Sequence, residues 1–317
     1  MCRKYSFRSK PSKKFIISND GYLLYKILIQ KKDFTKTLCL VRNLKYHRQT
    51  NGVNDFRLFD FGSIYEISIK EKRHFRRFPF EVASIEKDSF DSFRNLTILK
   101  LDSCQMKCIE SDIFKSLSNL LTLDLGLNGI SQLNASGFRG LGNLEELHLD
   151  RNKLTKIESD SFQHLKKLKK LNLASNLLDQ IEPNGFRALS YVEELNLNRN
   201  KLDKLGSNVY EHLKGLKKLE LGWNQLAKID SDECRGLENL LELHLHGNQL
   251  TKVEANTFQH LNSLKILDLR LNGLSEIDLD EFQGLDNLEE LNLEGTFLRN
   301  VDESVFKSLS KLKKMSI

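Results

Sequence analysis

The sequence is poor in the residues that build disulfide frameworks, proline-rich linkers and membrane spans. It contains 3 prolines, 1 tryptophan and 5 cysteines in 317 residues. The cysteines are odd in number and irregularly spaced, which predicts neither a disulfide framework nor a cysteine-based zinc site; they are Cys2, Cys39, Cys104, Cys108 and Cys234. No stretch approaches the roughly 18 consecutive apolar residues of a membrane-spanning helix, so we expect no transmembrane segment.

The sequence also lacks a recognisable secretion signal and the motifs of common enzymes. A basic patch from Arg3 to Lys14 is followed only by Phe15-Ile16-Ile17 before Asn19 and Asp20 interrupt the apolar run, whereas a signal peptide needs a longer one. No phosphate-binding loop, nucleotide fingerprint, kinase motif or zinc-protease motif is present. We therefore expect no enzyme activity, no catalytic residues and no cofactor.

The formal net charge of +6 is unevenly distributed along the chain. Residues 1–94 hold 21 Lys and Arg against 10 Asp and Glu, while residues 95–317 hold 28 against 33. We predict that residues 1–60 form a basic and poorly ordered N-terminal extension. A basic arm that contacts nucleic acid or an anionic membrane is the alternative.

From Asn95 onward one pattern recurs every 24 residues, in the form L-x-x-L-x-L-x-x-N-x-L-x-x-I-x-x-x-x-F-x-x-L. Nine copies fit residues 95–310, and a tenth begins at Lys311 and is cut short at Ile317. Residues 61–94 hold a degenerate repeat and a candidate capping strand with Ile64, Ile67 and Ile69. Such internal repetition is typical of a solenoid, in which each unit buries its apolar face only against its neighbours.

Each repeated position has a physical role. The L-x-L alternation predicts a short strand with one buried face. The Asn positions, from Asn128 to Asn272 in steps of 24, predict a ladder of side-chain amides that satisfy backbone groups where the chain leaves each strand. The late position, Phe in most copies but Tyr210 and Cys234 in two, predicts an aromatic spine beneath the convex side.

These motifs closely resemble the leucine-rich-repeat family, and the 24-residue length with a late Phe resembles its "typical" subclass. The resemblance implies a curved, right-handed solenoid of the α/β class, with a parallel sheet on the concave face and short helices or loops on the convex face. That subclass is found mainly in animal cell-surface receptors and matrix proteins, which implies an extracellular or cell-surface scaffold that binds another macromolecule. The cysteine-rich caps of such proteins are not visible here.

Two other functions and one mode of assembly stay open from the sequence. The missing caps and signal favour an intracellular, cytoplasmic adaptor as the alternative. In a third hypothesis, the repeats form the substrate-recognition arm of an enzyme whose catalytic domain lies elsewhere. An uncapped apolar edge after Lys311 also makes dimerisation through this edge a possibility.

The outward positions of the predicted sheet are polar and chemically mixed, which favours a folded protein partner over nucleic acid. Trp223, the only tryptophan, is the strongest single candidate because interface hot spots favour Trp, Tyr and Arg; the alternative is a rim tryptophan that packs against its neighbours. The predicted partner-binding residues are His148, Arg151, Asn172, Asn196, Arg199, Glu220, Trp223, His244, His246, Asp268 and Arg270.

Two other outward features have competing interpretations. Glu and Lys pairs alternate from repeat to repeat, as in Glu145-Glu146 and Lys169-Lys170, and we expect mutual neutralisation rather than a charged docking strip. His244 and His246 share one strand face, and Glu220 or Asp268 could add a third metal ligand. Because zinc needs three or four ligands in tight geometry, we assign no metal site from the sequence.

Overall fold

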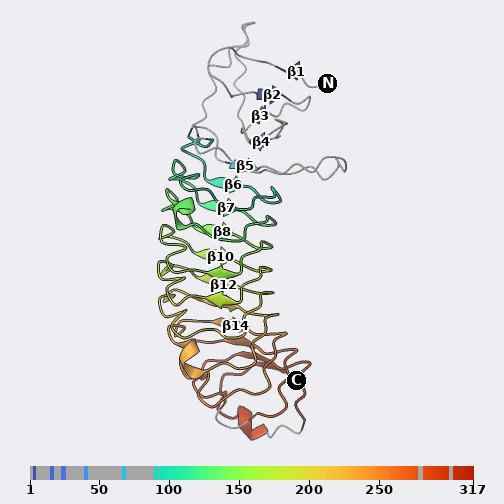
Figure 1. Ribbon diagram of the computed structural model, residues 1–317. Coiled ribbons are helices and arrows are strands. Elements are labelled where there is room, and N and C mark those ends of the chain that lie inside the picture. The colour runs from blue at the N-terminus through green and yellow to red at the C-terminus, as the bar shows by residue number, and fades with distance from the viewer. Residues whose placement is uncertain are drawn as a thin grey trace.

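The computed structural model describes five short strands before residue 69, and then residues 89–91, 93–277, 281–299 and 303–317. Successive coils of the chain stack on one another and form a long column (Figure 1). One sheet of 15 strands runs along this column. The expected solenoid with a parallel sheet along one side is confirmed for the repeats.

Each repeat contributes one three-residue strand to the large sheet. Neighbouring strands are parallel and shifted by one repeat, so that Leu171 pairs with Leu195 and Leu195 with Leu219. This register places all the buried leucines on the same face of the sheet. The strands are β6 (Ile98–Lys100), β7 (Thr122–Asp124), β8 (Glu146–His148), β10 (Lys170–Asn172), β12 (Glu194–Asn196), β13 (Lys218–Glu220), β14 (Glu242–His244), β15 (Ile266–Asp268), β16 (Glu290–Asn292) and β17 (Lys314–Ser316).

The N-terminal strands continue the same sheet with a different topology. The segment β5 (Glu66–Ser68) pairs in parallel with β6, and its Ile67 is the partner of Leu99. This strand lies where a capping strand was expected, whereas Ile64 and Ile69 lie outside the described residues. The strands before it pair antiparallel in chain order; they are β1 (Arg3–Lys4), β2 (Phe15–Ile17), β3 (Leu23–Tyr25) and β4 (Cys39–Val41).

Most of residues 1–60 lie outside the described residues. The expectation of a poorly ordered basic extension therefore stays a prediction. At the other end, Met315 and Ile317 are exposed on and beside β17. Dimerisation through this edge also stays a prediction.

The interior of the column is built from the repeated leucines and the late aromatic position. Rings of successive coils lie 5.8 Å apart between the centroids of Phe90 and Phe114 and 6.2 Å apart between those of Phe162 and Phe186. These separations favour attractive contacts between aromatic rings. Cys234 takes the same position and is fully buried, and burial raises the pKa of its thiol to about 12. The predicted aromatic spine is thus present, with a cysteine in one coil.

The predicted ladder of asparagine amides is also present. Asn176 donates to the carbonyl oxygens of Leu149 and Leu173 at 2.9 and 3.0 Å and accepts from the backbone N–H of Leu154 at 3.1 Å. The corresponding bonds recur in the coils of Asn152, Asn200, Asn224, Asn248 and Asn272. Each amide therefore joins two coils through backbone groups that would otherwise be buried without partners.

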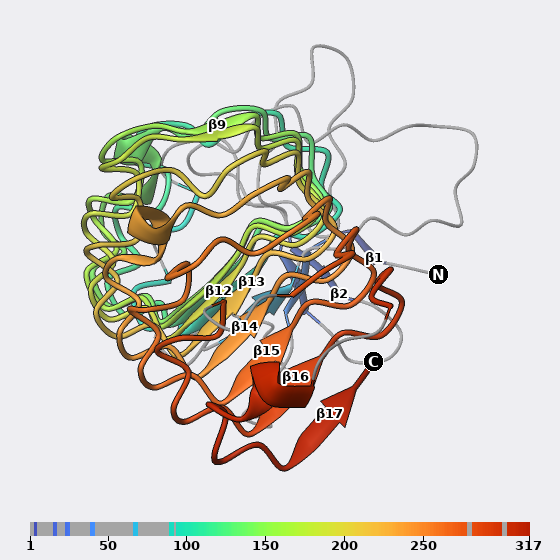
Figure 2. The ribbon, with the colours of Figure 1, turned by 90° about the horizontal axis from the view of Figure 1, so that it is seen from below.

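The side of the coils opposite the large sheet consists mainly of turns (Figure 2). Three short 3-10 helices lie in the described residues: η3 (Ala135–Phe138), η4 (Ser231–Cys234) and η5 (Glu303–Phe306). A second sheet of two strands, β9 (Lys156–Ile157) and β11 (Gln180–Ile181), joins two coils. Within the described part of the chain, no helix has the length and apolarity to cross a bilayer.

Candidate functional site

The outer surface of the large sheet, which we call the sheet face, carries the predicted binding residues. In β14, Leu243 points into the core, while Glu242 and His244 on either side of it are partly exposed. The residue two positions after the strand end, such as His246, extends the same surface. Three parallel columns of outward side chains, those that contain Glu242, His244 and His246, therefore line the sheet face, and each column repeats every 24 residues.

Part of the sheet face is used to shape the chain itself. Asn172 accepts a hydrogen bond from the backbone N–H of Ala174 at 3.1 Å, and Asn196 accepts one from Asn198 at 3.0 Å. An Asn or Asp side chain that binds the backbone two residues later stabilises a turn. Asn172 and Asn196, both predicted to bind a partner, thus also hold the end of their own strands.

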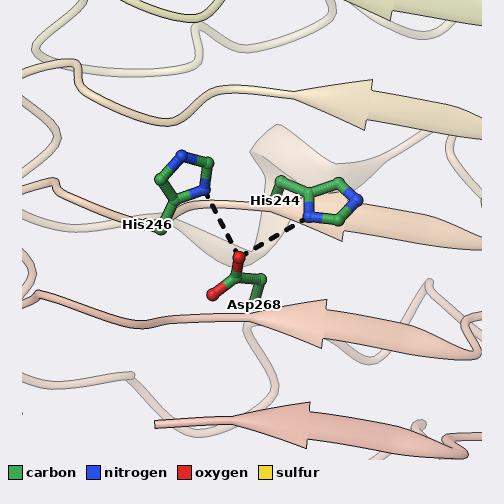
Figure 3. Close-up of side chains that lie close together, drawn as sticks. All are labelled: His244, His246 and Asp268. Atoms are coloured by element: carbon green, nitrogen blue, oxygen red, sulfur yellow. Dashed lines mark ion pairs between the residues drawn. The ribbon is translucent and has the colours of Figure 1, made fainter. Parts of the chain in front are cut away.

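Four of the predicted residues meet at β14 and β15 (Figure 3 labels three of them). Asp268 is the register partner of His244, and its Oδ2 lies 3.7 Å from Nδ1 of His244 and 3.4 Å from Nδ1 of His246. Arg270 holds the other side of the carboxylate, with Nε 2.9 Å from Oδ1 and Nη2 2.8 Å from Oδ2. We call His244, His246, Asp268 and Arg270 the histidine cluster.

The electrostatics of the histidine cluster favour an ionised carboxylate. Burial alone would raise the pKa of Asp268, but its interactions with His244, His246 and Arg270 outweigh burial and hold that pKa well below its ordinary range. The interaction with Asp268, together with Glu242 and Glu220, raises the pKa of His244 against the opposing effect of burial. Asp268 is therefore a negative charge at neutral pH, held at the base of the sheet face.

Trp223 lies beside the histidine cluster and is 45% exposed. Arg199 places its guanidinium carbon 5.4 Å from the centre of the indole ring, and the His246 ring meets the indole edge-on at 6.3 Å. The indole also covers Gly247, where a Cβ would come within 2.8 Å of it. Cation–π and edge-on ring contacts both stabilise such an arrangement, so the ring is held in place and yet reachable.

The other predicted residues lie apart from this group or take intermediate positions. His148 is on β8, and β10, β12 and β13 separate it from β14. Arg151 is exposed on the same rim as Trp223, three coils earlier. Glu220 lies on β13, where it binds Lys218 at 2.9 Å and accepts a hydrogen bond from Asn198. The structure thus joins Arg199, Trp223 and the histidine cluster, with Glu220 on the neighbouring strand.

Some residues that shape the site were not predicted from the sequence. Gly222 lies directly under the His246 ring, and a Cβ there would overlap the imidazole. Glu242 lies 3.4 Å from Nε2 of His244 through its Oε2. Asp150 occupies the position equivalent to Gly222 three coils earlier. Burial and the charge of Asp124 raise the pKa of its carboxyl group. The sequence held one signal for Gly222: it and His246 each lie two residues after the end of a strand, in consecutive repeats.

The alternating charge pairs neutralise one another, as expected. Lys169 lies 3.0 Å from Glu145, and Lys217 lies 2.9 Å from Glu193. These side chains are about half exposed, and such pairs contribute about 0–1 kcal/mol each. They therefore keep neighbouring coils from repelling one another and give no strip of a single charge.

A family model described as "Leucine rich repeat" matches four overlapping segments, 94–154, 142–202, 190–250 and 238–298, which cover more than half of the chain. No curated protein sequence matches the chain.

Several solved structures share the fold. TLR13 in its complex with ssRNA13 is 30% identical, with a TM-score of 0.69, over 72% of this chain and 33% of that one. Toll from Drosophila, in its complex with Spatzle, is 25% identical, with a TM-score of 0.62, over 74% and 34%. A leucine-rich-repeat protein of Leptospira interrogans is 28% identical, with a TM-score of 0.58, over 74% and 63%.

This chain thus spans about a third of the length of the first two proteins and under two thirds of the third. The family match coincides with the stacked coils, their parallel strands and their asparagine ladder. The chain therefore belongs to the leucine-rich-repeat family.

Proposed function

We propose that this chain is a non-catalytic binding protein that recognises a protein partner through the sheet face around Trp223. The observation that carries the proposal is the state of that side chain: it is 45% exposed, yet Arg199 and His246 fix its orientation. A tryptophan ordered before binding loses little conformational entropy when a partner covers it. Trp and Arg side chains are among the residue types that contribute most of the binding energy measured at protein interfaces.

The chemistry of the surrounding surface supports a protein rather than a nucleic acid. Residues 95–317 carry 28 basic and 33 acidic side chains, and the lysines of the sheet are paired with glutamates. A nucleic-acid surface needs a groove of unpaired basic residues interleaved with several stacking aromatic rings, whereas Arg199 on Trp223 is a single such pair. TLR13 was solved with single-stranded RNA and Toll with Spatzle, so RNA is the outcome that the experiment must separate from protein.

The test is affinity capture by the full chain and by two variants with matched backbone geometry. Trp223 and Ser175 both have a positive φ, of 56°, on the same rim, so Trp223→Gly and Ser175→Gly make equivalent backbone changes. We expect the parent and Ser175→Gly to retain the same protein from an extract, and Trp223→Gly to lose it. Retention that survives protease but not ribonuclease treatment would contradict a protein partner.

The repeat subclass supports placement at the cell surface or in the matrix, with an intracellular adaptor as the alternative. The full-length gene product, tagged and produced in cells of the source organism, distinguishes these two. Labelling with a reagent that cannot enter cells should modify the protein on intact cells or in the medium. Labelling only after lysis would favour the adaptor.

A further inference from the structure

The histidine cluster contains three potential metal ligands in close proximity. His244, His246 and Asp268 each offer one ligand atom that lies within 4.8 Å of the ligand atoms of the other two. The Nδ1 atoms of the two histidines stand 3.7 and 3.4 Å from Oδ2 of the carboxylate, and Figure 3 shows both rings turned toward it. In a tetrahedral zinc site with bonds of about 2.0–2.2 Å, neighbouring ligand atoms stand about 3.3–3.6 Å apart. The two nitrogen–oxygen distances are close to that geometry.

We propose that His244, His246 and Asp268 bind a divalent transition-metal ion with the ligand preference of zinc. Two imidazole nitrogens and one carboxylate oxygen form a ligand set that suits zinc and similar ions, and not the all-oxygen set preferred by calcium or magnesium. Three protein ligands leave a fourth position for water or another ligand. The three ligands lie on the sheet face beside Trp223, but the metal site does not depend on the proposed function.

The surroundings of each ligand support this role. The His246 ring is confined between Gly222, which it covers, and the edge of Trp223. Its Nδ1 is buried and faces Oδ2 of Asp268 at 3.4 Å without making a hydrogen bond of good geometry, although a buried imidazole nitrogen normally makes one to a partner. A metal ion between the three ligand atoms would provide that partner.

The other two ligands are also held by neighbours. Oε2 of Glu242 lies 3.4 Å from Nε2 of His244, which leaves Nδ1 directed at Asp268. Metal-bound histidines commonly place the second ring nitrogen against a carboxylate in this way. Arg270 donates to Oδ1 of Asp268 from both Nε and its backbone N–H, at 2.9 and 3.1 Å. The carboxylate is thus oriented before any ion binds.

The local charge allows a cation to bind next to Arg270. Glu220 and Glu242 flank the histidines, and Lys218 lies within 2.9 and 3.5 Å of them, respectively. Without the imidazoles, which bind a metal ion in their neutral form, the carboxylates of Glu220, Glu242 and Asp268 outnumber the cations Lys218 and Arg270 by one. When Oδ2 of Asp268 binds a metal ion, Arg270 can still donate to Oδ1 from Nε and from its backbone N–H. The cluster therefore offers a net negative site to a divalent ion.

The first experiment compares zinc uptake by the full chain and its variants after treatment with a chelator, by equilibrium dialysis and calorimetry. The variants are His246→Ala and Asp268→Asn, and the matched control is His148→Ala, which removes a sheet-face histidine outside the cluster. We expect the parent and His148→Ala to bind one zinc ion more than either cluster variant. Equal zinc uptake and affinity in all four proteins would overturn the proposal. Circular dichroism and urea midpoints verify folding.

A second measurement needs no variant. Cobalt(II) bound tetrahedrally by nitrogen and oxygen gives visible absorption bands, whereas a cysteine ligand adds an intense thiolate-to-metal band in the near ultraviolet. We expect one equivalent of cobalt to give the visible bands without the thiolate band, and zinc to remove them. A thiolate band, or no visible bands, would place the ion elsewhere or exclude it, and either result would overturn the proposal.

Discussion

The imidazole ring of His246 lies directly over Gly222 of the preceding coil, so close that a Cβ at Gly222 would overlap it. Because Gly222 has no side chain, the ring of His246 has room to lie beside Asp268. No positive φ is required at Gly222, so the glycine is needed for space and not for its backbone freedom. Its role can be tested by adding a single methyl group.

Gly222→Ala should push the His246 ring away from Asp268 while both ligands remain in the chain. We expect zinc affinity, measured by calorimetry, to fall about tenfold to a hundredfold, the usual cost of disturbing the support of a metal ligand. Gly126→Ala is the control, because it adds the same methyl group in the same column, 3.2 Å from Asp124 and Asp150. Equal affinities of the two variants would show that Gly222 does not position His246.

Trp223 holds a left-handed backbone conformation, with φ of 56°. That conformation costs a non-glycine residue about 1–2 kcal/mol. Trp223→Gly should therefore be more stable than Trp223→Ala, by about 1 kcal/mol in urea unfolding. The same comparison at Ser175, which also has φ of 56°, should give the same difference. This explanation would be contradicted if the glycine variant were more stable than the alanine variant at Ser175 but not at Trp223.

The asparagine ladder should contribute much more to stability than exposed asparagines do. Asn176→Ala leaves the buried N–H of Leu154 without its side-chain partner and removes one of the two asparagine donors from each of the carbonyl oxygens of Leu149 and Leu173. We expect a loss of about 2–3 kcal/mol. Asn143→Ala removes two exposed bonds, one to the carbonyl oxygen of Ser118 and one from Nζ of Lys167, and should cost less than about 1 kcal/mol. Chemical denaturation measures both; similar losses would refute a special role for the ladder.

Asp150 should make folding depend on pH in a direction opposite to that of a salt-bridged carboxylate. Burial and the charge of Asp124 raise its pKa, against smaller opposing effects from its own backbone, His148 and Arg151. Because the folded state then holds a proton more tightly than the unfolded state, stability falls as pH rises from the ordinary Asp value through the folded pKa.

Asp150→Asn removes this ionisation and should therefore stabilise the protein at neutral pH. Urea unfolding at a series of pH values should show the advantage shrinking toward zero as the pH falls below the ordinary Asp pKa. The column already holds an asparagine at Asn198, which makes the substitution compatible with the fold. A constant difference at all pH values would mean that ionisation of Asp150 is not the cause.

The repeat pattern predicted the fold because every coil repeats the same physical problem. Leu147 and Leu171 are equivalent positions whose burial follows from the alternation within a strand, and their pairing follows from the 24-residue spacing. The bonds of Asn176 followed from the need to satisfy backbone groups at a turn. Neither inference required knowledge of a particular neighbouring side chain.

The site was predicted only in part, because it depends on side chains in different coils. The sequence put His244 and His246 on one face and gave Glu220 and Asp268 as possible third ligands. It could not show that both rings turn toward Asp268, since this direction depends on Glu242, Gly222 and Arg270. Arg199 and Trp223 were both predicted to bind a partner, but the contact of the indole with Gly247 was not foreseen.

The proposed role of the exposed Trp223 ring is that of an anchor for a protein partner. Its most direct test is the Kd of the captured partner, purified, for the parent, Trp223→Gly and Ser175→Gly. We predict that Trp223→Gly weakens binding by about 2 kcal/mol, roughly thirtyfold, while Ser175→Gly binds like the parent. A Kd unchanged by Trp223→Gly, in a protein that remains folded, would contradict the account.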